Sequence, residues 1–349
     1  MAKVALLLSG GIDSSFALYL LREKGFEVKG FSLLFHPQSR CCSMDGLKRA
    51  EWLCKTIGVD YELLDVSEEF EKLVINPFVE GYLAGTTPNP CLACNRYLKF
   101  GLFLDLMLKK GFDYIASGHY ARIERNSENQ ECLLKKGIDT TKDQSYMLFY
   151  LRKPYLKNIL FPLGSMVKEE VIQISRQTGI WAGELKESQD ICFVEGNLGR
   201  FFQEKGLMID KGPIVNDKGQ LLGYHKGLFL YTIGQREGLG ISYREPLYVI
   251  GKDLEKNHLI VGRRDDALKR NLLVSDLNFF YQGYKNTEMK VKARIRYGMK
   301  EKEATIKPSP NDKIELVFTE PQFAPTPGQG AVFYQEDIVI GGGIIQETL

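Results

Sequence analysis

Residues 4–24 read VALLLSGGIDSSFALYLLREK, and this stretch decides the fold of the N-terminal half. Its apolar start, residues 4–8, suits a buried strand and is too short for a signal peptide or a membrane span. Residues 14–24 carry apolar side chains at helical spacing and end before Gly25. Between them, two glycines let the backbone turn tightly and approach a ligand closely. The stretch therefore predicts the first strand–loop–helix unit of an α/β sheet.

Two interpretations of the turn at residues 9–15, SGGIDSS, stay open. As an anion site, it places Ser14 and Ser15 where a helix leaves N–H groups unpaired and where its dipole adds positive potential. It is not a Walker loop, because the Gly-Lys-Ser/Thr ending is missing. As a plain turn, it would only cap the helix through Asp13 or Ser14.

The alternation of strand and helix patterns continues beyond this turn. Strands are expected at residues 28–34, 61–66 and 114–117, and helices at residues 44–57 and 97–109. This repetition predicts a parallel sheet with helices on both faces. Glycines become dense from Gly206 to Gly240. From Leu272 onward, period-two segments separated by turn residues predict an antiparallel sheet or small barrel.

The bulk composition is that of an ordinary globular protein. The 349 residues are 44% hydrophobic and 26% charged, and the net charge of +2 argues neither for nor against a nucleic-acid partner. No stretch approaches the roughly 18 apolar residues of a membrane span, so we expect a cytoplasmic protein without a membrane partner. The odd number of cysteines, seven, argues against a disulfide framework.

Residues 86–96, TTPNPCLACNR, combine a proline-stiffened loop with two cysteines three positions apart. If a helix begins here, Cys91 and Cys94 face one side of its N-terminus, where thiolates are stabilised, and Arg96 adds positive charge. A reactive thiol is therefore expected.

The other cysteines carry weaker signals. Cys192, within SQDICF at residues 188–193, looks by itself like a core cysteine. The adjacent Cys41 and Cys42 are most simply a detail of a loop, and a redox accessory is the alternative.

Residues 289–297 read MKVKARIRY, in which every second residue is a cation. In a strand, these cations share one face while the apolar residues face the core. The cationic face predicts either a stripe for nucleic-acid phosphates or an ordinary solvated surface. The four cations are Lys290, Lys292, Arg294 and Arg296.

Almost from end to end, the chain resembles the tRNA-specific 2-thiouridylase family of the PP-loop ATP pyrophosphatase superfamily. The shared blocks, in the family's order, are SGGIDSS, TTPNPCLACNRYLKF (86–100), ASGHYAR (116–122), KDQSYMLFYL (142–151), FPLG (161–164), SQDICFVEG (188–196) and YTIGQREGLGI (231–241). The resemblance implies a PP-loop domain of the adenine nucleotide α-hydrolase type at 1–200, a small central domain at 201–270 and a β-barrel-like tRNA-binding domain at 271–349.

The resemblance also implies a reaction, the ATP-dependent 2-thiolation of the wobble uridine of tRNA. ATP, with Mg²⁺, would adenylate the uracil C2 oxygen, and Cys94 would be the nucleophile and Cys192 the persulfide carrier. A cysteine desulfurase or sulfur-relay protein would supply the sulfur. The implied ATP-binding residues are Leu7, Leu8, Ser9, Gly10, Gly11, Ile12, Asp13, Ser14, Leu33 and Gly118. The implied contacts to tRNA or its target base are Asn89, Pro90, Cys91, His119, Lys142, Asp143, Gln144, Arg296, Tyr297 and Gln329.

Alternatives remain at several of these positions. Many family members have aspartate in place of Cys91, so a 4Fe–4S cluster on Cys91, Cys94 and Cys192 rivals the persulfide. Zinc would more often need a fourth protein ligand. His119 is either a satisfied polar residue or a ligand contact at a strand end.

Two other functions also stay open. An amidotransferase-type synthetase or lysidine synthetase would use the loop without the cysteines. An RNA-binding or iron–sulfur sensor protein would need no ATP loop.

Overall fold

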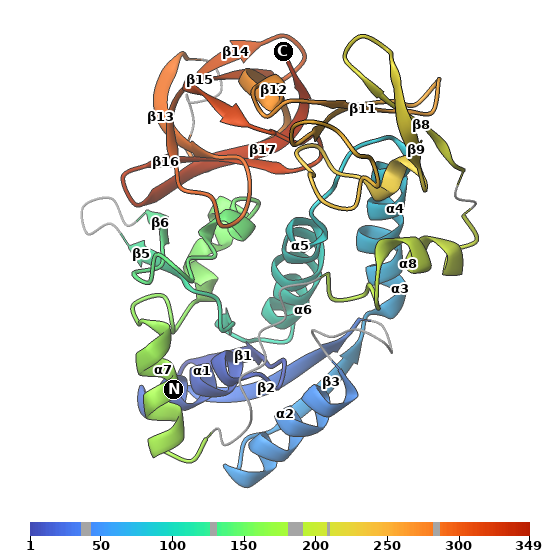
Figure 1. Ribbon diagram of the computed structural model, residues 1–349. Helices are drawn as coiled ribbons and strands as arrows, with labels where there is room; N and C mark the ends of the chain where they lie inside the picture. Colours follow the sequence, from blue (N-terminus) through green and yellow to red (C-terminus); the bar gives the residue numbers. More distant parts are fainter. Residues whose placement is uncertain (36–42, 126–130, 181–190, 208–209, 282–286) are drawn as a thin grey trace. The chain divides into compact units, whose positions relative to one another are not determined.

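A computed structural model describes residues 1–35, 43–125, 131–180, 191–207, 210–281 and 287–349 (Figure 1). The chain forms two compact units. The first unit comprises residues 1–75, 90–194 and 336–340, and the second unit comprises 76–89, 195–335 and 341–349. Cys41, Cys42 and residues 188–190 lie outside the described part of the chain.

The first unit is built on a five-stranded sheet in the order β3-β2-β1-β4-β7, and every neighbouring pair is parallel. The strands are β1 Lys3–Leu7, β2 Glu27–Leu34, β3 Tyr61–Asp65, β4 Tyr114–Ala116 and β7 Ile159–Leu160. The helices that follow β1, β2 and β7 are α1 Ile12–Glu23, α2 Met44–Thr56 and α7 Lys168–Gln177. This alternation confirms the parallel α/β sheet expected from the sequence.

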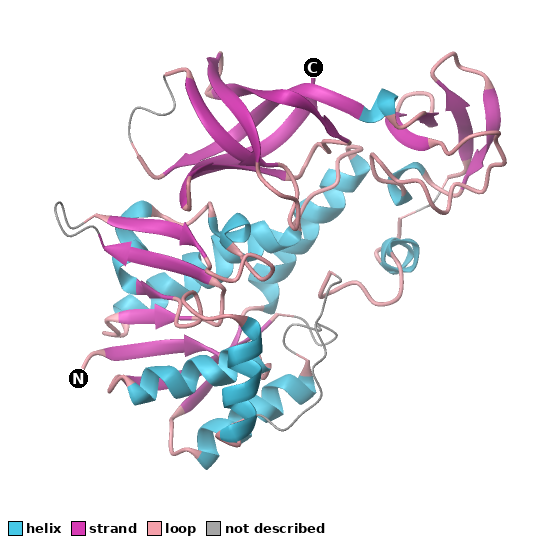
Figure 2. Ribbon diagram, turned by 60° about the vertical axis from the view of Figure 1, so that its left-hand side comes forward, coloured by secondary structure: helices cyan, strands magenta, loops and turns pink. Residues whose placement is uncertain are grey.

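Helices cover both faces of this sheet (Figure 2). Apolar residues of α1 and α2, including Leu18 and Leu53, share one buried cluster with Val4 and Leu6 of β1. On the other face, Phe31 of β2 packs edge-on against Phe103, with 5.5 Å between ring centroids. Phe103 begins α6, Phe103–Lys109.

The helix before α6 begins earlier than the pattern at residues 97–109 suggested. The helical stretch starts with α5, Pro90–Ala93, and runs through a π-helical segment, Cys94–Leu102, into α6. Proline is well tolerated in a first helical turn, because its missing N–H has no intrahelical partner there. Both Cys91 and Cys94 are therefore helical residues close to a helix N-terminus. π-Helical turns occur frequently at functional sites.

Shorter elements complete the first unit. They are α3 Ser67–Phe70, the π-helix Glu71–Ile75, the hairpin β5 Ala121–Arg125 with β6 Cys132–Lys136, and the 3₁₀ helices Ser145–Leu148 and Lys153–Asn158. The hairpin pairs in register from Ala121–Lys136 to Arg125–Cys132. Lys135 of β6 also pairs with Ile338, so the 336–340 segment extends the hairpin.

The second unit contains two β structures. A four-stranded sheet has the order β10-β11-β8-β9, with β8 Gly212–Asn216, β9 Leu221–His225, β10 Tyr248–Asp253 and β11 His258–Gly262. An antiparallel barrel comprises β12 Leu268–Phe279, β13 Met289–Arg294, β14 Lys302–Ser309, β15 Lys313–Phe323, β16 Gly330–Gln335 and β17 Ile338–Thr348. Pairing of β12 with β17 closes the barrel, as the sequence predicted.

Helices α4, Asn76–Leu83, and α8, Leu198–Glu204, also belong to the second unit. They pack through Phe78 and Phe202, whose stacked rings lie 6.4 Å apart.

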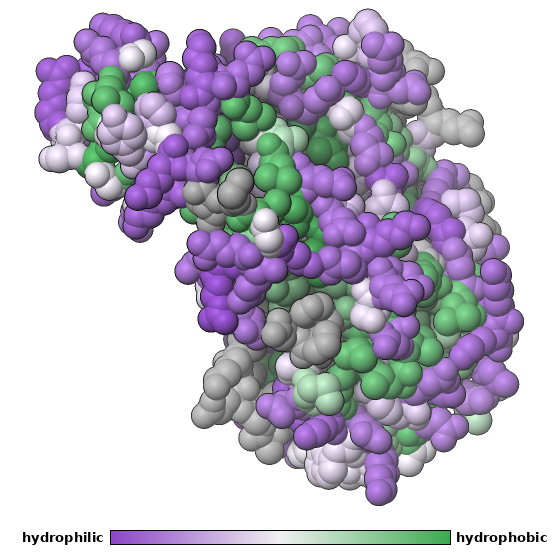
Figure 3. Space-filling view, turned by 90° about the vertical axis from the view of Figure 1, so that its right-hand side faces the viewer, coloured by the Kyte–Doolittle hydropathy of each residue, from purple (hydrophilic) through white to green (hydrophobic). Residues whose placement is uncertain are grey.

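On the face drawn in Figure 3, hydrophilic residues surround smaller patches of hydrophobic ones. Within the described residues, no helix is both long and apolar enough to cross a membrane.

Candidate active site

The turn between β1 and α1 is an open helix N-terminus. The Ser9 N–H donates to Ser14 Oγ at 3.2 Å, and Ser14 Oγ donates in turn to the Gly11 carbonyl at 3.0 Å. Gly11 is the N-cap residue, its backbone is extended, and no side chain caps the helix. The cap through Asp13 or Ser14 that the plain-turn interpretation expected is therefore not formed. An uncapped helix N-terminus of this kind is suited to binding an anion.

Close backbone packing fixes this loop from two sides. Gly10 has φ +70°, and a Cβ atom there would lie 1.9 Å from the carbonyl oxygen of Gly46 in α2. Arg49 of the same helix donates from Nε to the Gly10 carbonyl at 3.1 Å. On the other side, a Cβ atom at Gly118 would lie 2.9 Å from the carbonyl carbon of Asp13. Both glycines are needed for space, and Gly10 also for its backbone conformation.

The Asp13 carboxylate is held by two residues that sequence reasoning missed. Its Oδ1 accepts from the Tyr120 hydroxyl at 2.7 Å and from Lys168 Nζ at 2.6 Å. Tyr120 and Lys168 are almost fully buried. Lys168 begins α7, and in the sequence it precedes two glutamates, which is the pattern of an exposed helix end. Nothing in that pattern signals a lysine that reaches the loop.

The other residues proposed for ATP differ in their exposure. Ser9 is exposed, while the side chains of Leu8, Ile12, Ser14 and Leu33 are buried. Leu33 lies near the end of β2 and belongs to the core, with 2% of its surface exposed. Any contact of Leu33 with adenine would therefore involve its backbone or the edge of a buried side chain.

The two cysteines of the π-containing helix differ in accessibility. Cys91 is exposed, whereas only 9% of the Cys94 surface is exposed. Next to Cys94, Asn95 is buried and donates from Nδ2 to the Met147 carbonyl at 3.0 Å. The guanidinium of Arg96 stacks over the Tyr150 ring at 4.1 Å. These contacts fix the helix turn that presents Cys94.

Cys192 is half-buried and is placed by its neighbour Phe193. The Phe193 ring packs edge-on against Phe70 of α3 at 5.7 Å, and α3 packs against the π-helical segment that begins at Cys94. Within the described residues, however, no three Cys, His, Asp or Glu side chains come together as metal ligands would. The placement of Cys91, Cys94 and Cys192 therefore does not fit the three-thiolate cluster site.

His119 follows β4 and is enclosed by aromatic rings. Its centroid lies 5.6 Å from that of Phe100 and 5.8 Å from that of Phe161, and its Nδ1 lies 2.8 Å from Ser117 Oγ. Burial, with a smaller contribution from the charge of Lys99, holds the pKa of His119 well below its ordinary value. The ring is therefore neutral and able to accept or donate hydrogen bonds near neutral pH.

The depressed pKa of His119 predicts a pH-dependent stability. Below about pH 6.5 the unfolded chain protonates this ring while the native protein does not, so stability falls as the pH falls. The free energy of unfolding should fall by up to about 1.4 kcal/mol per pH unit until the pH reaches the pKa of His119 in the native protein. Urea unfolding of the wild type and of His119→Asn between pH 7.5 and pH 5.5 measures this. An equally steep loss in both proteins would show that His119 is not the cause.

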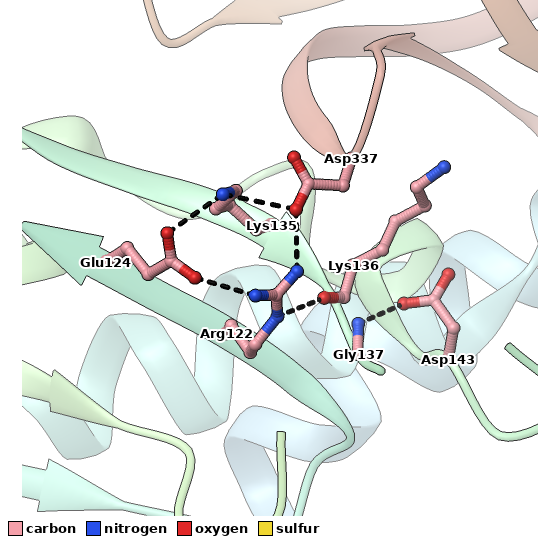
Figure 4. Close-up of polar contacts among 7 residues, drawn as sticks. All are labelled: Arg122, Glu124, Lys135, Lys136, Gly137, Asp143 and Asp337. Atoms are coloured by element: carbon pink, nitrogen blue, oxygen red, sulfur yellow. Dashed lines mark hydrogen bonds and ion pairs between the residues drawn. The ribbon is translucent and has the colours of Figure 1, made fainter. Parts of the chain in front are cut away.

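The loop at residues 142–144 lies beside a network of charges on the β5–β6 hairpin (Figure 4). The Arg122 guanidinium binds Glu124 and Asp337, each at 2.6 Å, and Lys135 binds the same two carboxylates at 2.8 and 3.1 Å. Burial alone would raise the pKa of Asp337, but hydrogen bonds from Lys135 and Arg122 outweigh it and lower that pKa. The network fixes the strand from which the 137–145 loop departs.

Asp143 points into the protein rather than toward a ligand. Only 4% of its surface is exposed. Its Oδ1 accepts from the backbone N–H groups of Gly137 and Ser145 at 3.0 and 3.1 Å, and its Oδ2 accepts from Ser145 Oγ at 2.9 Å. In Figure 4 its carboxylate faces the Gly137 backbone. Asp143 therefore shapes the loop that carries Lys142 and Gln144.

This geometry predicts that Asp143→Asn weakens the fold more than it weakens tRNA binding. The amide has one acceptor oxygen fewer, so the Ser145 hydroxyl can no longer donate to that atom, and loss of this buried hydrogen bond costs about 1–3 kcal/mol. Chemical denaturation measures this loss, and filter binding of tRNA at a temperature where both proteins are folded measures affinity. Lys142→Ala is the matched comparison, expected to lower affinity and to spare stability. Lower affinity with unchanged stability in Asp143→Asn would contradict the assignment.

In the second unit, two of the candidate tRNA contacts, Arg296 and Gln329, lie at the residues 324–329 turn. Gln329 Nε2 donates to the Thr87 carbonyl at 2.6 Å, and the Thr87 N–H donates to the Pro327 carbonyl at 2.8 Å. Arg296 donates from Nη2 to Thr326 Oγ1 at 3.0 Å. Gln329 thus ties the barrel to the loop that leads into Asn89, and Arg296 supports the same turn.

The four cations of residues 289–297 do not form one phosphate stripe. Strand β13 ends at Arg294, so Arg296 and the exposed Tyr297 lie in the turn that follows. Arg294 is nearly buried, pairs with Glu301 at 2.7 Å and lies over the Tyr334 ring. Only Lys290 and Lys292 are exposed on the strand itself. The strand pattern correctly predicted the buried face, because Val291, Ala293 and Ile295 are in the core.

Three family models match the chain in order. The tRNA methyl transferase HUP domain matches residues 2–196, the tRNA methyl transferase PRC-barrel domain residues 200–263, and the aminomethyltransferase β-barrel domain residues 269–345. A tRNA-specific 2-thiouridylase MnmA 2 of Thermoanaerobacter sp. (strain X514) is 42% identical over 99% of this chain and 98% of its own. The tRNA-specific 2-thiouridylase MnmA of Acetivibrio thermocellus is 42% identical over 99% of both chains.

Among solved structures, the U34-tRNA thiolase NcsA from Methanococcus maripaludis with its 4Fe–4S cluster is a distant match. It is 20% identical, with a TM-score of 0.37 over 54% of this chain and 60% of that chain. At this level of similarity, the cluster of that protein says nothing about this chain.

Proposed function

The chain belongs to the tRNA-specific 2-thiouridylase family, and on that premise we propose that it catalyses the ATP-dependent 2-thiolation of the wobble uridine of tRNA. The observation that carries the proposal is 42% identity to such enzymes over 99% of the chain. The uncapped phosphate loop would activate the base, and the Cys94 thiol would take part in sulfur transfer. In this proposal residues 1–200 form the catalytic segment, residues 201–270 a central segment and residues 271–349 the tRNA-binding barrel.

The first step activates the base. Oxygen at C2 of uracil is a poor leaving group, so it attacks the α-phosphate of ATP, the α–β bond breaks and pyrophosphate departs. The first-turn N–H groups of α1 would hold the pyrophosphate, and Mg²⁺ would share its charge. Lys168 neutralises Asp13, which would otherwise repel the phosphates. Leu33 and Gly118 would border the nucleotide.

The second step transfers sulfur. The terminal sulfur of a Cys192 persulfide attacks C2, and the C2–O bond breaks to release AMP. The Cys94 thiolate then attacks the Cys192 sulfur, the S–S bond to the transferred sulfur breaks, and 2-thiouridine is left with a Cys94–Cys192 disulfide. A thiol reductant must return two electrons to restore both cysteines. An upstream cysteine desulfurase or sulfur-relay protein would load Cys192.

In this scheme Cys91 is a neighbour of the target base rather than a ligand. With Asn89 and Pro90 it lies where the loop meets the helix N-terminus, and its thiol is exposed. The base must be splayed out of the anticodon loop to reach Cys94. His119, Lys142, Gln144, Arg296, Tyr297 and Gln329 would contact the tRNA around it.

The test is mass analysis of tRNA nucleosides after incubation with ATP, Mg²⁺ and a sulfur donor. We expect a sulfur-for-oxygen mass gain confined to the wobble uridine, with AMP formed in equal amount. A methylated uridine, or no modified nucleoside at all, would overturn the proposal. Iron and sulfide assays on anaerobically purified protein test for the iron–sulfur cluster. An enzyme that is active but colourless and free of iron would show that thiolation does not need the cluster.

A further inference from the structure

A chain of hydrogen bonds connects the proposed tRNA-contacting loop to the phosphate loop within the first unit. Gln144 makes two hydrogen bonds to the backbone of Tyr120. The Gln144 N–H donates to the Tyr120 carbonyl at 2.9 Å, and Gln144 Oε1 accepts from the Tyr120 N–H at 3.0 Å. The Tyr120 hydroxyl then donates to Asp13 at 2.7 Å. Tyr120 thus contacts one loop through its backbone and the other through its side chain.

Lys168 is a second residue that holds Asp13 in place. Lys168 Nζ binds the same carboxylate oxygen at 2.6 Å and lies 5.8 Å from the centre of the Tyr120 ring. The Lys168 N–H donates to Asp139 Oδ2 at 3.0 Å, and Asp139 also accepts from the N–H of Thr141. Burial alone would raise the pKa of Asp139, but these hydrogen bonds and that from the Thr141 hydroxyl lower it. Lys168 therefore joins Asp13 to the start of the loop that ends at Gln144.

We propose that Tyr120 is a positioning residue that couples tRNA binding at residues 142–144 to ATP binding at residues 9–15. The coupling follows from shared geometry, because a shift of Gln144 moves the Tyr120 backbone, and the nearly buried hydroxyl carries that shift to Asp13. Asp13 lies in the first turn of α1, so its position sets the N–H groups that receive the phosphates. The proposal rests on the proposed function, since it assumes that both ligands bind.

Coupling between two ligands is reciprocal, and this makes the proposal measurable. We would titrate tRNA with and without a non-hydrolysable ATP analogue, and the analogue with and without tRNA. In the wild type each ligand should tighten the other by about five- to tenfold or more. In Tyr120→Phe, which removes only the hydroxyl, the ratio should fall toward one. Gln144→Ala should lower it as well, and the double variant should lower it no further.

A merely structural role for Tyr120 would weaken both affinities without changing their ratio. Tyr19→Phe is the matched control, because it also removes one tyrosine hydroxyl, from a ring on α1 that stacks on Phe16 with 5.7 Å between the centroids. It should keep the wild-type ratio. A wild-type ratio of one, or an unchanged ratio in Tyr120→Phe, overturns the coupling. Either result leaves the thiolation assay untouched, whereas a wild type that thiolates no tRNA removes the proposed function itself.

Discussion

Replacing Cys192 by serine should abolish tRNA thiolation and AMP release, while tRNA-dependent pyrophosphate release from ATP continues. A serine cannot carry a persulfide, whereas adenylation depends on the phosphate loop and not on this thiol. The loss should be on the order of 10³-fold or more, the scale on which removal of a catalytic nucleophile acts. Thiolated nucleoside and pyrophosphate are measured in the same reaction. Full thiolation by the variant would exclude Cys192 as the carrier.

Two further substitutions separate the persulfide from the cluster. Cys94→Ser should also lose thiolation, since the sulfur attached to C2 could not be released from Cys192. Cys91→Asp should keep it, because an exposed side chain next to the target base holds no sulfur in the persulfide route. Loss of activity in all three variants would favour the cluster instead. Cys132→Ser, on β6, is the control for the removal of a thiol outside the site.

Gly10→Ala should greatly lower kcat/KM for ATP, and Gly25→Ala should leave it unchanged. Both glycines have positive φ, +70° and +77°, so both substitutions carry a conformational cost of about 1–2 kcal/mol. At Gly25 nothing lies within 4 Å of the added Cβ atom, but at Gly10 it would lie 1.9 Å from the Gly46 carbonyl oxygen. Relief of that overlap must move the loop away from α2, and overpacking adds about 1–3 kcal/mol.

The expected readout for Gly10→Ala is a fall of about 100-fold or more in kcat/KM for ATP, because a displacement of about 1 Å at a reacting centre costs that much. AMP formation with saturating tRNA measures it, and thermal unfolding reports the accompanying loss of stability. Gly25→Ala should match the wild type in AMP formation and lose only part of its stability. Wild-type kcat/KM in Gly10→Ala would mean that the loop does not bind the phosphates.

Local patterns predicted the elements that build the site. The strand before the loop and the helix after it lie within two residues of the expected bounds, because apolar periodicity and glycine punctuation act over short distances. The barrel could be predicted from its period-two segments for the same reason. The helix at the cysteines began seven residues early, since its first turn consists of a proline and residues without apolar spacing.

The contacts that tune the site depended on the tertiary fold. Arg294 looked like one of four equivalent cations, but only folding brings Glu301 and the Tyr334 ring to it. Asp143 looked like a polar loop residue, and its inward hydrogen bonds from Gly137 and Ser145 could not be predicted from the sequence. The environment of Cys54 also depends on the tertiary fold, because burial raises the pKa of its thiol to about 11 and leaves the thiol unreactive.

The ion pair between Asp13 and Lys168 has a consequence for how the protein is made. Its partners are 155 positions apart in the chain, and β7 and α7 follow most of the first unit in order of synthesis. A growing polypeptide that has emerged from the ribosome only as far as β4 already has the SGGIDSS turn, yet it lacks the cation that neutralises it. Nucleotide affinity should therefore arise late in translation, after the helix that begins at residue 168 has been released and has folded back onto α1.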